Sequence, residues 1–262
     1  MHIKPKKRLG QNFLIDPNIQ RKIVRACELL PTDTVIEIGS GRGELTKSFA
    51  GQVKRVFALE LDGRLIETLE NNLREYPNVS VLNQDVLKVD LGPIIHNIGK
   101  GELVVIGNIP YYITTPIIER LFSYKDAIGR IFLTVQKEFA RRIAAPPGSK
   151  EYGAFSCFVQ YHAIPEILFT INRTCFRPAP KPDSAFIKLK IRSSPSFKVK
   201  DEVRLFKIIR AAFGQRRKTL RNSLEGIVPL EKLRRFFDSC TLEENSRPER
   251  LSLEDFIRLA NI

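Results

Sequence analysis

A short polar and aromatic tetrad, Asn108-Ile109-Pro110-Tyr111, follows an apolar run at residues 103–106. The side-chain carbonyl of Asn108 is a hydrogen-bond acceptor, and the fixed φ of Pro110 gives a rigid loop that can present backbone carbonyls. Tyr111 adds a ring for stacking. This set suits a flat base with an exocyclic amine, because accepting the amine protons localises a lone pair that is otherwise delocalised into the ring. An ordinary Asn-X-Pro turn is an equally good interpretation of the tetrad alone.

A glycine loop follows an earlier predicted strand. Residues 34–38 form that strand, and Gly39-Ser40-Gly41-Arg42-Gly43 leads from it into a predicted helix over residues 44–50. Glycines let the backbone turn sharply and approach a ligand closely. The G-x-G-x-G spacing differs from that of dinucleotide sites, and the carboxylate of Glu37 favours a cationic sulfonium over a pyrophosphate. A tight strand-to-helix turn is the alternative interpretation.

Acidic residues end the next two predicted strands. Glu60 ends a strand over residues 55–60, where a carboxylate can accept both hydroxyls of a ribose, and Asp62 is the alternative acceptor. Asp85 follows the strand that begins at residue 79, and it can accept from an adenine amine with Val86 beside the ring. Helix capping and an Asp turn are the structural alternatives. Since carboxyl ends of parallel strands meet at one edge, these groups and the tetrad are expected to share one pocket.

The elements that position these groups alternate between strands and helices up to residue 192, which predicts an α/β, Rossmann-like domain. Residues 9–16 mix amides with apolar side chains and fit a flap over a ligand, or a plain N-terminal arm. Beyond a boundary at residues 193–196 the pattern is helical. We therefore expect a domain with an N-terminal flap over residues 1–192 and a small all-α domain over residues 197–262.

The charge of the chain is strongly basic. Its 262 residues include 43 basic and 29 acidic side chains, a formal net charge of +14, of which residues 1–25 contribute +6 and residues 164–221 contribute +11. Two basic segments beside a near-neutral body favour a nucleic-acid partner over a merely solvated surface. The cationic cluster suited to phosphate and RNA contacts consists of Arg216, Arg217, Lys218 and Arg221.

Several classes of protein are disfavoured by composition. The four cysteines at positions 27, 157, 175 and 240 have no metal-site spacing and there are only three histidines, so no metal site is expected and a reducing cytoplasm is favoured. No secretory signal, membrane-spanning run or lipid-binding helix stands out, so no membrane partner is expected. We expect a monomer, because no apolar stripe is left to bind a second copy.

These motifs together resemble the ribosomal RNA small-subunit adenine N6,N6-dimethyltransferase family (KsgA type). The similarity rests on segments 10–14, 37–43, 108–111, 176–184 and 215–223, and the last of these resembles this housekeeping branch more than the macrolide-resistance adenine methyltransferases. The resemblance implies an S-adenosyl-L-methionine-dependent methyltransferase domain. It also implies dimethylation of two adjacent adenosines near the 3′ end of small-subunit ribosomal RNA, on a precursor subunit late in its assembly.

The resemblance assigns a role to individual residues. From the residues themselves we expect that Asn108 and the Pro110 carbonyl accept hydrogen bonds from the target amine while Tyr111 stacks on the ring. Phe176 is a candidate for the opposite face of the base, and a core Phe at a strand end is an equally good interpretation. Cofactor contacts are implied for a set that spans the flap, the glycine loop and the strand ends: Asn12, Leu14, Gly39, Gly41, Glu60, Asp85, Val86 and Asn108. Ser40, Tyr112 and Thr114 depart from the usual family residues, which are Pro, Asn and Ser.

Two rival functions compete with this interpretation. One is another amine methyltransferase, acting on DNA adenine or on a protein glutamine, because similar tetrads serve those reactions. The basic helical segment argues against glutamine. The other is an RNA-binding ribosome-assembly factor that keeps the fold without catalysis, against which the intact glycine loop and tetrad argue.

Overall fold

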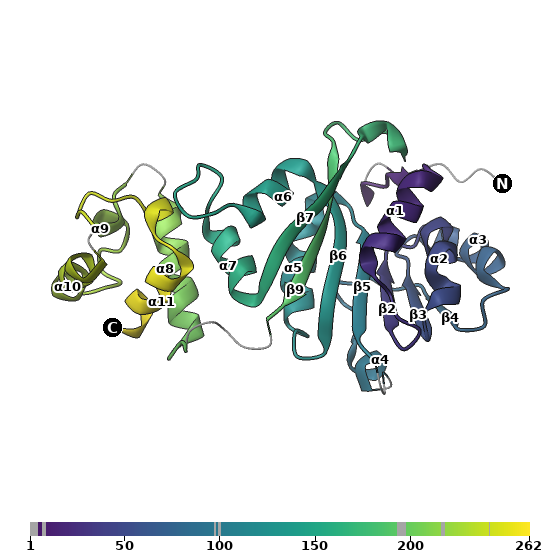
Figure 1. Ribbon diagram of the computed structural model, residues 1–262, viewed down its shortest axis with the longest axis horizontal. Helices are drawn as coiled ribbons and strands as arrows, with labels where there is room; N and C mark the ends of the chain where they lie inside the picture. Colours follow the sequence, from purple (N-terminus) through teal and green to yellow (C-terminus); the bar gives the residue numbers. More distant parts are fainter. Residues whose placement is uncertain are drawn as a thin grey trace. The chain divides into compact units, whose positions relative to one another are not determined.

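The computed structural model describes residues 5–6, 9–96, 98, 101–192, 198–215, 218–240 and 242–262. The chain forms two compact units (Figure 1). Unit 1 comprises residues 1–140 and 166–191, and unit 2 comprises residues 141–165 and 192–262. One division between the units falls between residues 191 and 192. Residues 141–165, which the sequence assigns to the first domain, instead belong to the second compact unit.

The centre of unit 1 is a seven-stranded sheet with the order β4-β3-β2-β5-β6-β9-β7. The pairs from β4 to β6 are parallel, and β9 runs antiparallel to β6. The chain turns in opposite directions from β2, toward β3 on one side and β5 on the other, so the edge between β2 and β5 is a topological switch point where such sheets bind ligands. The strands are β2 (Thr34–Ile38), β3 (Arg55–Leu59), β4 (Val79–Leu82), β5 (Leu103–Asn108), β6 (Ile128–Gln136), β7 (Ala163–Ile171) and β9 (Ser184–Ile191).

Helices cover both faces of this sheet. Figure 1 shows α1 (Pro17–Cys27) and α2 (Glu44–Phe49) on one face and α5 (Thr114–Phe122) on the other. Ile23 of α1 and Phe49 of α2 pack in one core cluster with Val35, which alternation along β2 directs toward them. All five residues of β2 are buried, as expected for a strand covered on both faces. The remaining helices here are α3 (Gly63–Leu73), α4 (Gly92–His96) and α6 (Lys137–Ala144), which runs from unit 1 into unit 2.

Short elements complete unit 1. The predicted cap of the first helix is present, since Asp16 accepts hydrogen bonds from the backbone N–H groups of Asn18 and Ile19. A separate two-stranded sheet pairs β1 (Phe13–Leu14) with β8 (Phe176–Arg177). Turns of 3₁₀ helix are η2 (Ala50–Gln52), η3 (Tyr111–Ile113) and η4 (Arg173–Cys175). The N-terminal segment is therefore tied to a loop far along the chain.

Unit 2 is built from helices around its own core. These are α7 (Ala154–His162), α8 (Glu202–Gly214), α9 (Leu220–Ser223), α10 (Leu230–Cys240) and α11 (Leu253–Asn261), with a 3₁₀ turn, η5 (Pro248–Arg250). Tyr152 and Cys157 are buried members of the same core cluster as Leu205 and Phe256. Residues 141–165 therefore join this unit because their apolar side chains complete its core.

The fold class matches the sequence prediction, an α/β domain followed by helices. Among the described residues, no helix is both long enough and apolar enough to cross a membrane.

Candidate functional site

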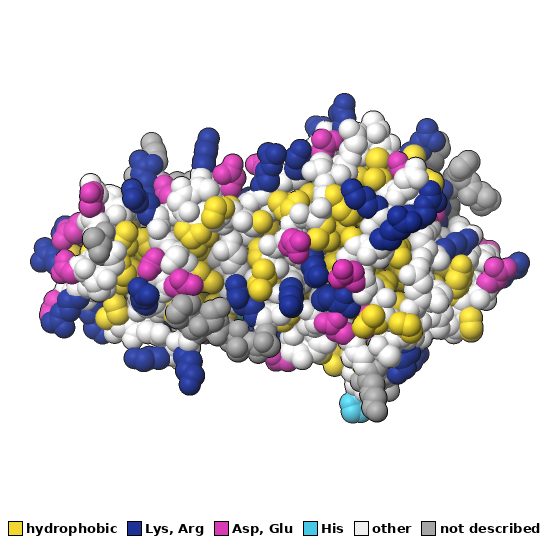
Figure 2. Space-filling model, viewed as in Figure 1, with side chains coloured by type: hydrophobic (Ala, Val, Ile, Leu, Met, Phe, Trp, Pro, Cys, Tyr) yellow, Lys and Arg dark blue, Asp and Glu magenta, His cyan; other side chains and the backbone are white. Residues whose placement is uncertain are grey.

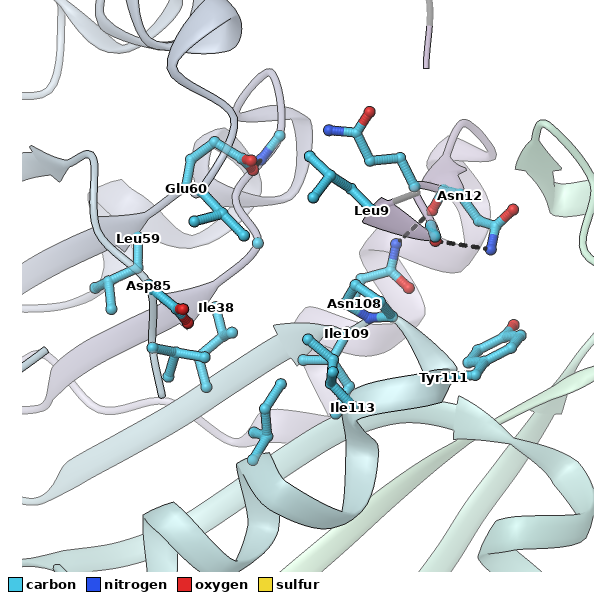
Figure 3. A pocket seen from close by; sticks show the side chains of 18 of the residues that line it. Leu9, Asn12, Ile38, Leu59, Glu60, Asp85, Asn108, Ile109, Tyr111 and Ile113 are labelled. Atoms are coloured by element: carbon cyan, nitrogen blue, oxygen red, sulfur yellow. Dashed lines mark hydrogen bonds between the residues drawn. The ribbon is translucent and has the colours of Figure 1, made fainter. Parts of the chain in front are cut away.

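A pocket opens at the carboxyl ends of β2 to β5, at the switch point of the sheet (Figure 3). Figure 3 shows Glu60 and Asp85 toward one end and Asn108 and Tyr111 toward the other. Apolar side chains such as Ile38 form walls between them. The pocket thus brings together most of the predicted site residues: Asn12, Gly39, Gly41, Glu60, Asp85, Val86, Asn108, Pro110 and Tyr111.

The glycine loop forms the floor where β2 ends. Gly39 has φ +73° and Gly41 has φ +60°, values in the left-handed region that favours glycine. A Cβ on Gly39 would come within 3.5 Å of the Asn108 carbonyl oxygen. This distance is an ordinary contact, so glycine is favoured here by the left-handed φ values of the turn.

Glu60 is a buried carboxylate held by the backbone around it. Its Oε2 accepts the Gly41 N–H at 2.9 Å and its Oε1 accepts the Asp62 N–H at 2.8 Å. Burial raises the pKa of this carboxyl above its usual range, while the two backbone bonds oppose that shift. Both oxygens are thus fixed at the end of β3, with lone pairs left for further donors.

Asp62, the alternative acceptor in the sequence, has a different position. It is absent from the pocket wall and instead accepts from Lys6 Nζ at 3.0 Å and from Gln11 Nε2 at 3.2 Å. Its hydrogen bonds with Arg64 above all, and then with Lys6 and Gln11, hold the pKa of its carboxyl well below the usual range. Asp62 therefore anchors the N-terminal segment beside the pocket, and of these two acids only Glu60 lines the pocket.

The N-terminal segment covers one side of the pocket, as expected for a flap. Leu9, Gly10, Gln11, Asn12 and Phe13 contribute to the wall. The Asn12 carbonyl accepts a hydrogen bond from Asn108 Nδ2 at 2.8 Å (Figure 3). Flap and tetrad are therefore joined directly.

Asn108 is the last residue of β5, and its amide has a defined orientation. Since Nδ2 donates to Asn12, Oδ1 is directed away from the flap carbonyl, toward the side of the pocket where Tyr111 lies (Figure 3). No described residue donates to this Oδ1. The Pro110 carbonyl accepts the Ile113 N–H at 3.2 Å and keeps one lone pair for another donor.

Tyr111 is held by a residue that sequence reasoning missed. Its hydroxyl lies 2.5 Å from the hydroxyl of Ser184, which is fully buried on β9. Burial raises the pKa of Tyr111 above its usual range, so the phenol stays protonated near neutral pH. Ser184 is 73 residues away in the chain, and no local pattern links it to the tetrad.

Two predicted site residues lie outside the pocket. Phe176 is 3% exposed and Leu14 is 7% exposed, and both pack in the core beneath α1. Pairing of β1 with β8 places them opposite each other. Stacking of Phe176 on a base stays a prediction, and in this structure the ring lies in the core. Leu14 likewise directs its side chain into that core, and the neighbouring Phe13 lines the pocket instead.

The predicted RNA-contacting cluster is only partly described. Arg216 and Arg217 lie outside the described residues. Lys218 is exposed, and Arg221 on α9 forms an ion pair with Glu244 at 2.6 Å. Figure 2 shows Lys and Arg side chains spread over the visible face among fewer acidic ones, without one dominant basic patch.

The chemistry of the pocket indicates the kind of ligand that fits. Its described lining contains two carboxylates, Glu60 and Asp85, and no lysine or arginine. That set matches hydroxyl and amine donors or a cation, and it does not match phosphate, which proteins usually bind with basic side chains or helix N-termini. No group of three metal-ligating side chains occurs within the described part of the chain.

A switch-point pocket with a glycine loop, strand-end acids and an Asn-Ile-Pro-Tyr tetrad defines a Rossmann-like methyltransferase domain. The family model for ribosomal RNA adenine dimethylase matches residues 2–262, and the chain belongs to this family. The ribosomal RNA small subunit methyltransferase A of Alkaliphilus metalliredigens (strain QYMF) is 44% identical over 257 residues, covering 97% of this chain and 90% of that protein.

Solved structures agree with this assignment. A dimethyladenosine transferase from Plasmodium falciparum superposes with a TM-score of 0.80 at 26% identity, covering 94% of this chain and 95% of that one. The 23S rRNA methyltransferase ErmE superposes with a TM-score of 0.77 at 25% identity, covering 95% of this chain and 98% of that one. The family resemblance, the fold class and the enzyme class predicted from the sequence are confirmed.

Proposed function

We propose that the protein transfers methyl groups from S-adenosyl-L-methionine to the N6 amines of two adjacent adenosines near the 3′ end of small-subunit ribosomal RNA, late in assembly of that subunit. The observation that carries this proposal is the orientation of Asn108. Its amide nitrogen is committed to the Asn12 carbonyl at 2.8 Å, so its carbonyl oxygen faces the pocket as an acceptor.

The cofactor end of the pocket is defined by its acids. Glu60 accepts the ribose hydroxyls with the lone pairs that its two backbone bonds leave open. Asp85 accepts from the adenine amine, and the Val86 side chain lies against the ring. The backbone of Gly39 and Gly41 allows close contact with the amino-acid end. When bound, the sulfonium supplies an electrophilic methyl group.

The residues at the other end hold the target base. An adenosine leaves the RNA stack and enters the pocket. Asn108 Oδ1 and the Pro110 carbonyl accept hydrogen bonds from its two N6 hydrogens. The Tyr111 ring, whose hydroxyl contacts Ser184, stacks on the base. These two acceptors would localise the N6 lone pair and direct it at the methyl group that the sulfonium would supply, and one N6 proton would pass to solvent as the methyl group is transferred. Positioning supplies most of the rate.

The small-subunit branch is supported by sequence identity. Relatives named ribosomal RNA small subunit methyltransferase A reach 44% identity, whereas the solved enzyme named for 23S rRNA reaches 25%. The excess of basic residues over acidic ones, 43 to 29, suits an RNA-bearing precursor particle as partner. The protein acts as a monomer on that particle, in the cytoplasm where ribosomal subunits assemble. The residues that contact RNA phosphates are Arg216, Arg217, Lys218 and Arg221.

The test is Asn108→Ala. Removing one preorganised polar contact at a reacting group lowers kcat by about 100- to 1000-fold, while binding of the immature subunit stays near the wild-type value because other residues hold the RNA. Transfer of labelled methyl to immature subunits and a filter-binding assay measure the two quantities. Asn18→Ala is the matched control, since Asn18 is exposed on α1 and bonds only Arg21 through its amide oxygen. Turnover like wild type in Asn108→Ala would remove the proposed role.

A further inference from the structure

Tyr112 is an exposed aromatic residue at the mouth of the pocket. Its side chain is 61% exposed, and no other described aromatic residue is exposed to this extent. No described residue forms a hydrogen bond with its hydroxyl. A single exposed apolar side chain is ordinary on a protein surface, but Tyr112 also lines the pocket, where an exposed ring is available to a base.

The geometry separates Tyr112 from the neighbouring tyrosine. Both lie in η3, and a 3₁₀ helix turns by about 120° per residue. Tyr111 consequently reaches toward Ser184 on β9, whereas Tyr112 lies against the flap. A Cβ on Gly10 would be 3.0 Å from Cε1 of the Tyr112 ring, so one ring edge rests on Gly10. The rest of the side chain is open at the pocket entrance.

We propose that Tyr112 is a specificity-determining residue that stacks on the nucleobase next to the target adenosine. This inference rests on the proposed function. Proteins that bind single-stranded RNA commonly stack unpaired bases on aromatic rings. When one of two adjacent adenosines enters the pocket and meets Tyr111, its neighbour stays outside at the entrance. Tyr112 is the ring that the chain presents there, one residue further along.

The neighbouring base explains why an aromatic ring is useful at this entrance. With two adjacent targets, the base that remains outside is itself an adenine, which has a large face for stacking. The Tyr112 ring can hold either adenosine outside the pocket while the other one is methylated inside it.

Steady-state methyl transfer to immature small subunits tests the stacking contact. Loss of a stacked base costs about 5- to 150-fold in affinity, so Tyr112→Ala raises KM for the subunit by that factor. Tyr112→Phe keeps the ring and stays within about threefold of wild type. Leu30→Ala is the matched control, since Leu30 is 56% exposed just before β2, at the opposite end of the strands from the pocket.

A second experiment changes the base instead of the protein. Immature subunits are prepared in which one or the other of the two adjacent adenosines is replaced by uridine, a poorer stacking base, so that each retains a single target. With wild-type enzyme, at least one replacement raises KM for the remaining target. With Tyr112→Ala the same replacement has little further effect, because the ring that discriminates the neighbour is gone.

The outcomes separate this inference from simpler ones. An unchanged KM in Tyr112→Ala, or a uridine effect equal in both enzymes, overturns the stacking role. A rise in the dissociation constant for S-adenosyl-L-methionine with no change in KM for the subunit also overturns it, because Tyr112 then only supports the flap. If wild-type enzyme transfers no methyl to immature subunits, the proposed function fails and this inference fails with it.

Discussion

Replacing Glu37 by glutamine is expected to stabilise the protein at pH 8 and to have little effect at pH 4. Glu37 is 2% exposed inside β2, and its carboxylate accepts a hydrogen bond from the Thr46 hydroxyl of α2. Burial raises the pKa of Glu37 to about 7, although its bonds with Thr46 and Ser40 oppose the shift. Glu37 lies behind the glycine loop and is not part of the pocket lining.

The magnitude follows from proton linkage. An unfolded chain releases this proton near pH 4.5, whereas the native protein keeps it until about pH 7. Between these values the unfolded state binds fewer protons, so native stability falls as pH rises through this window. The shift corresponds to about 3 kcal/mol, fully lost above pH 7. Glutamine has no proton to lose and can still accept from Thr46.

Urea unfolding of the cofactor-free protein at pH values from 4 to 8 measures this effect. The free energy of unfolding of Glu37→Gln minus that of wild type is expected to increase by about 3 kcal/mol across the range. Glu67→Gln, at an exposed position on α3, controls for the amide substitution itself. A difference that stays constant with pH, or that decreases, would refute the assignment of a native proton to Glu37.

Two further predictions concern the anchoring of the flap by Asp62 and the hydroxyl group of Tyr111. Asp62→Ala removes the acceptor for Lys6 and Gln11. Amide hydrogen exchange at residues 9–13, measured by mass spectrometry, is therefore expected to become faster, and the dissociation constant for S-adenosyl-L-methionine, measured by calorimetry, is expected to rise about tenfold. Unchanged exchange would contradict the anchoring role. Tyr111→Phe keeps the ring but loses the bond to Ser184, so kcat in the methyl-transfer assay falls by less than about tenfold; a loss as large as that of Asn108→Ala would mean that the hydroxyl itself takes part in the reaction.

The sequence predicts those parts of the site that depend on local pattern. Gly39, Glu60, Asp85 and Asn108 lie at or just after the ends of predicted strands, and parallel strands bring such positions to one edge without any knowledge of distant contacts. The helix cap at Asp16 is equally local, because its partners are two and three residues away. These elements could be placed from residue types and spacing alone.

The features that the sequence does not predict depend on pairing between distant segments. The sequence leaves two positions open for Phe176, one against a base and one in the core at a strand end, and only the pairing of β8 with β1 directs its ring into the core with Leu14. The bond from Tyr111 to Ser184 requires the register of β9. Residues 141–165 follow an α/β pattern locally, and only the apolar cluster around Leu205 places them in unit 2. Such long-range contacts have no local signal.

Transfer of labelled methyl from S-adenosyl-L-methionine, compared among acceptors, tests the central claim most directly. The acceptors are immature small ribosomal subunits that lack the modification, mature subunits, naked ribosomal RNA and duplex DNA. We predict that label enters the immature subunit and is recovered as N6,N6-dimethyladenosine from two adjacent positions near the 3′ end of its RNA. Label chiefly on DNA or on large-subunit RNA, or tight binding to the immature subunit without any transfer, would contradict this account.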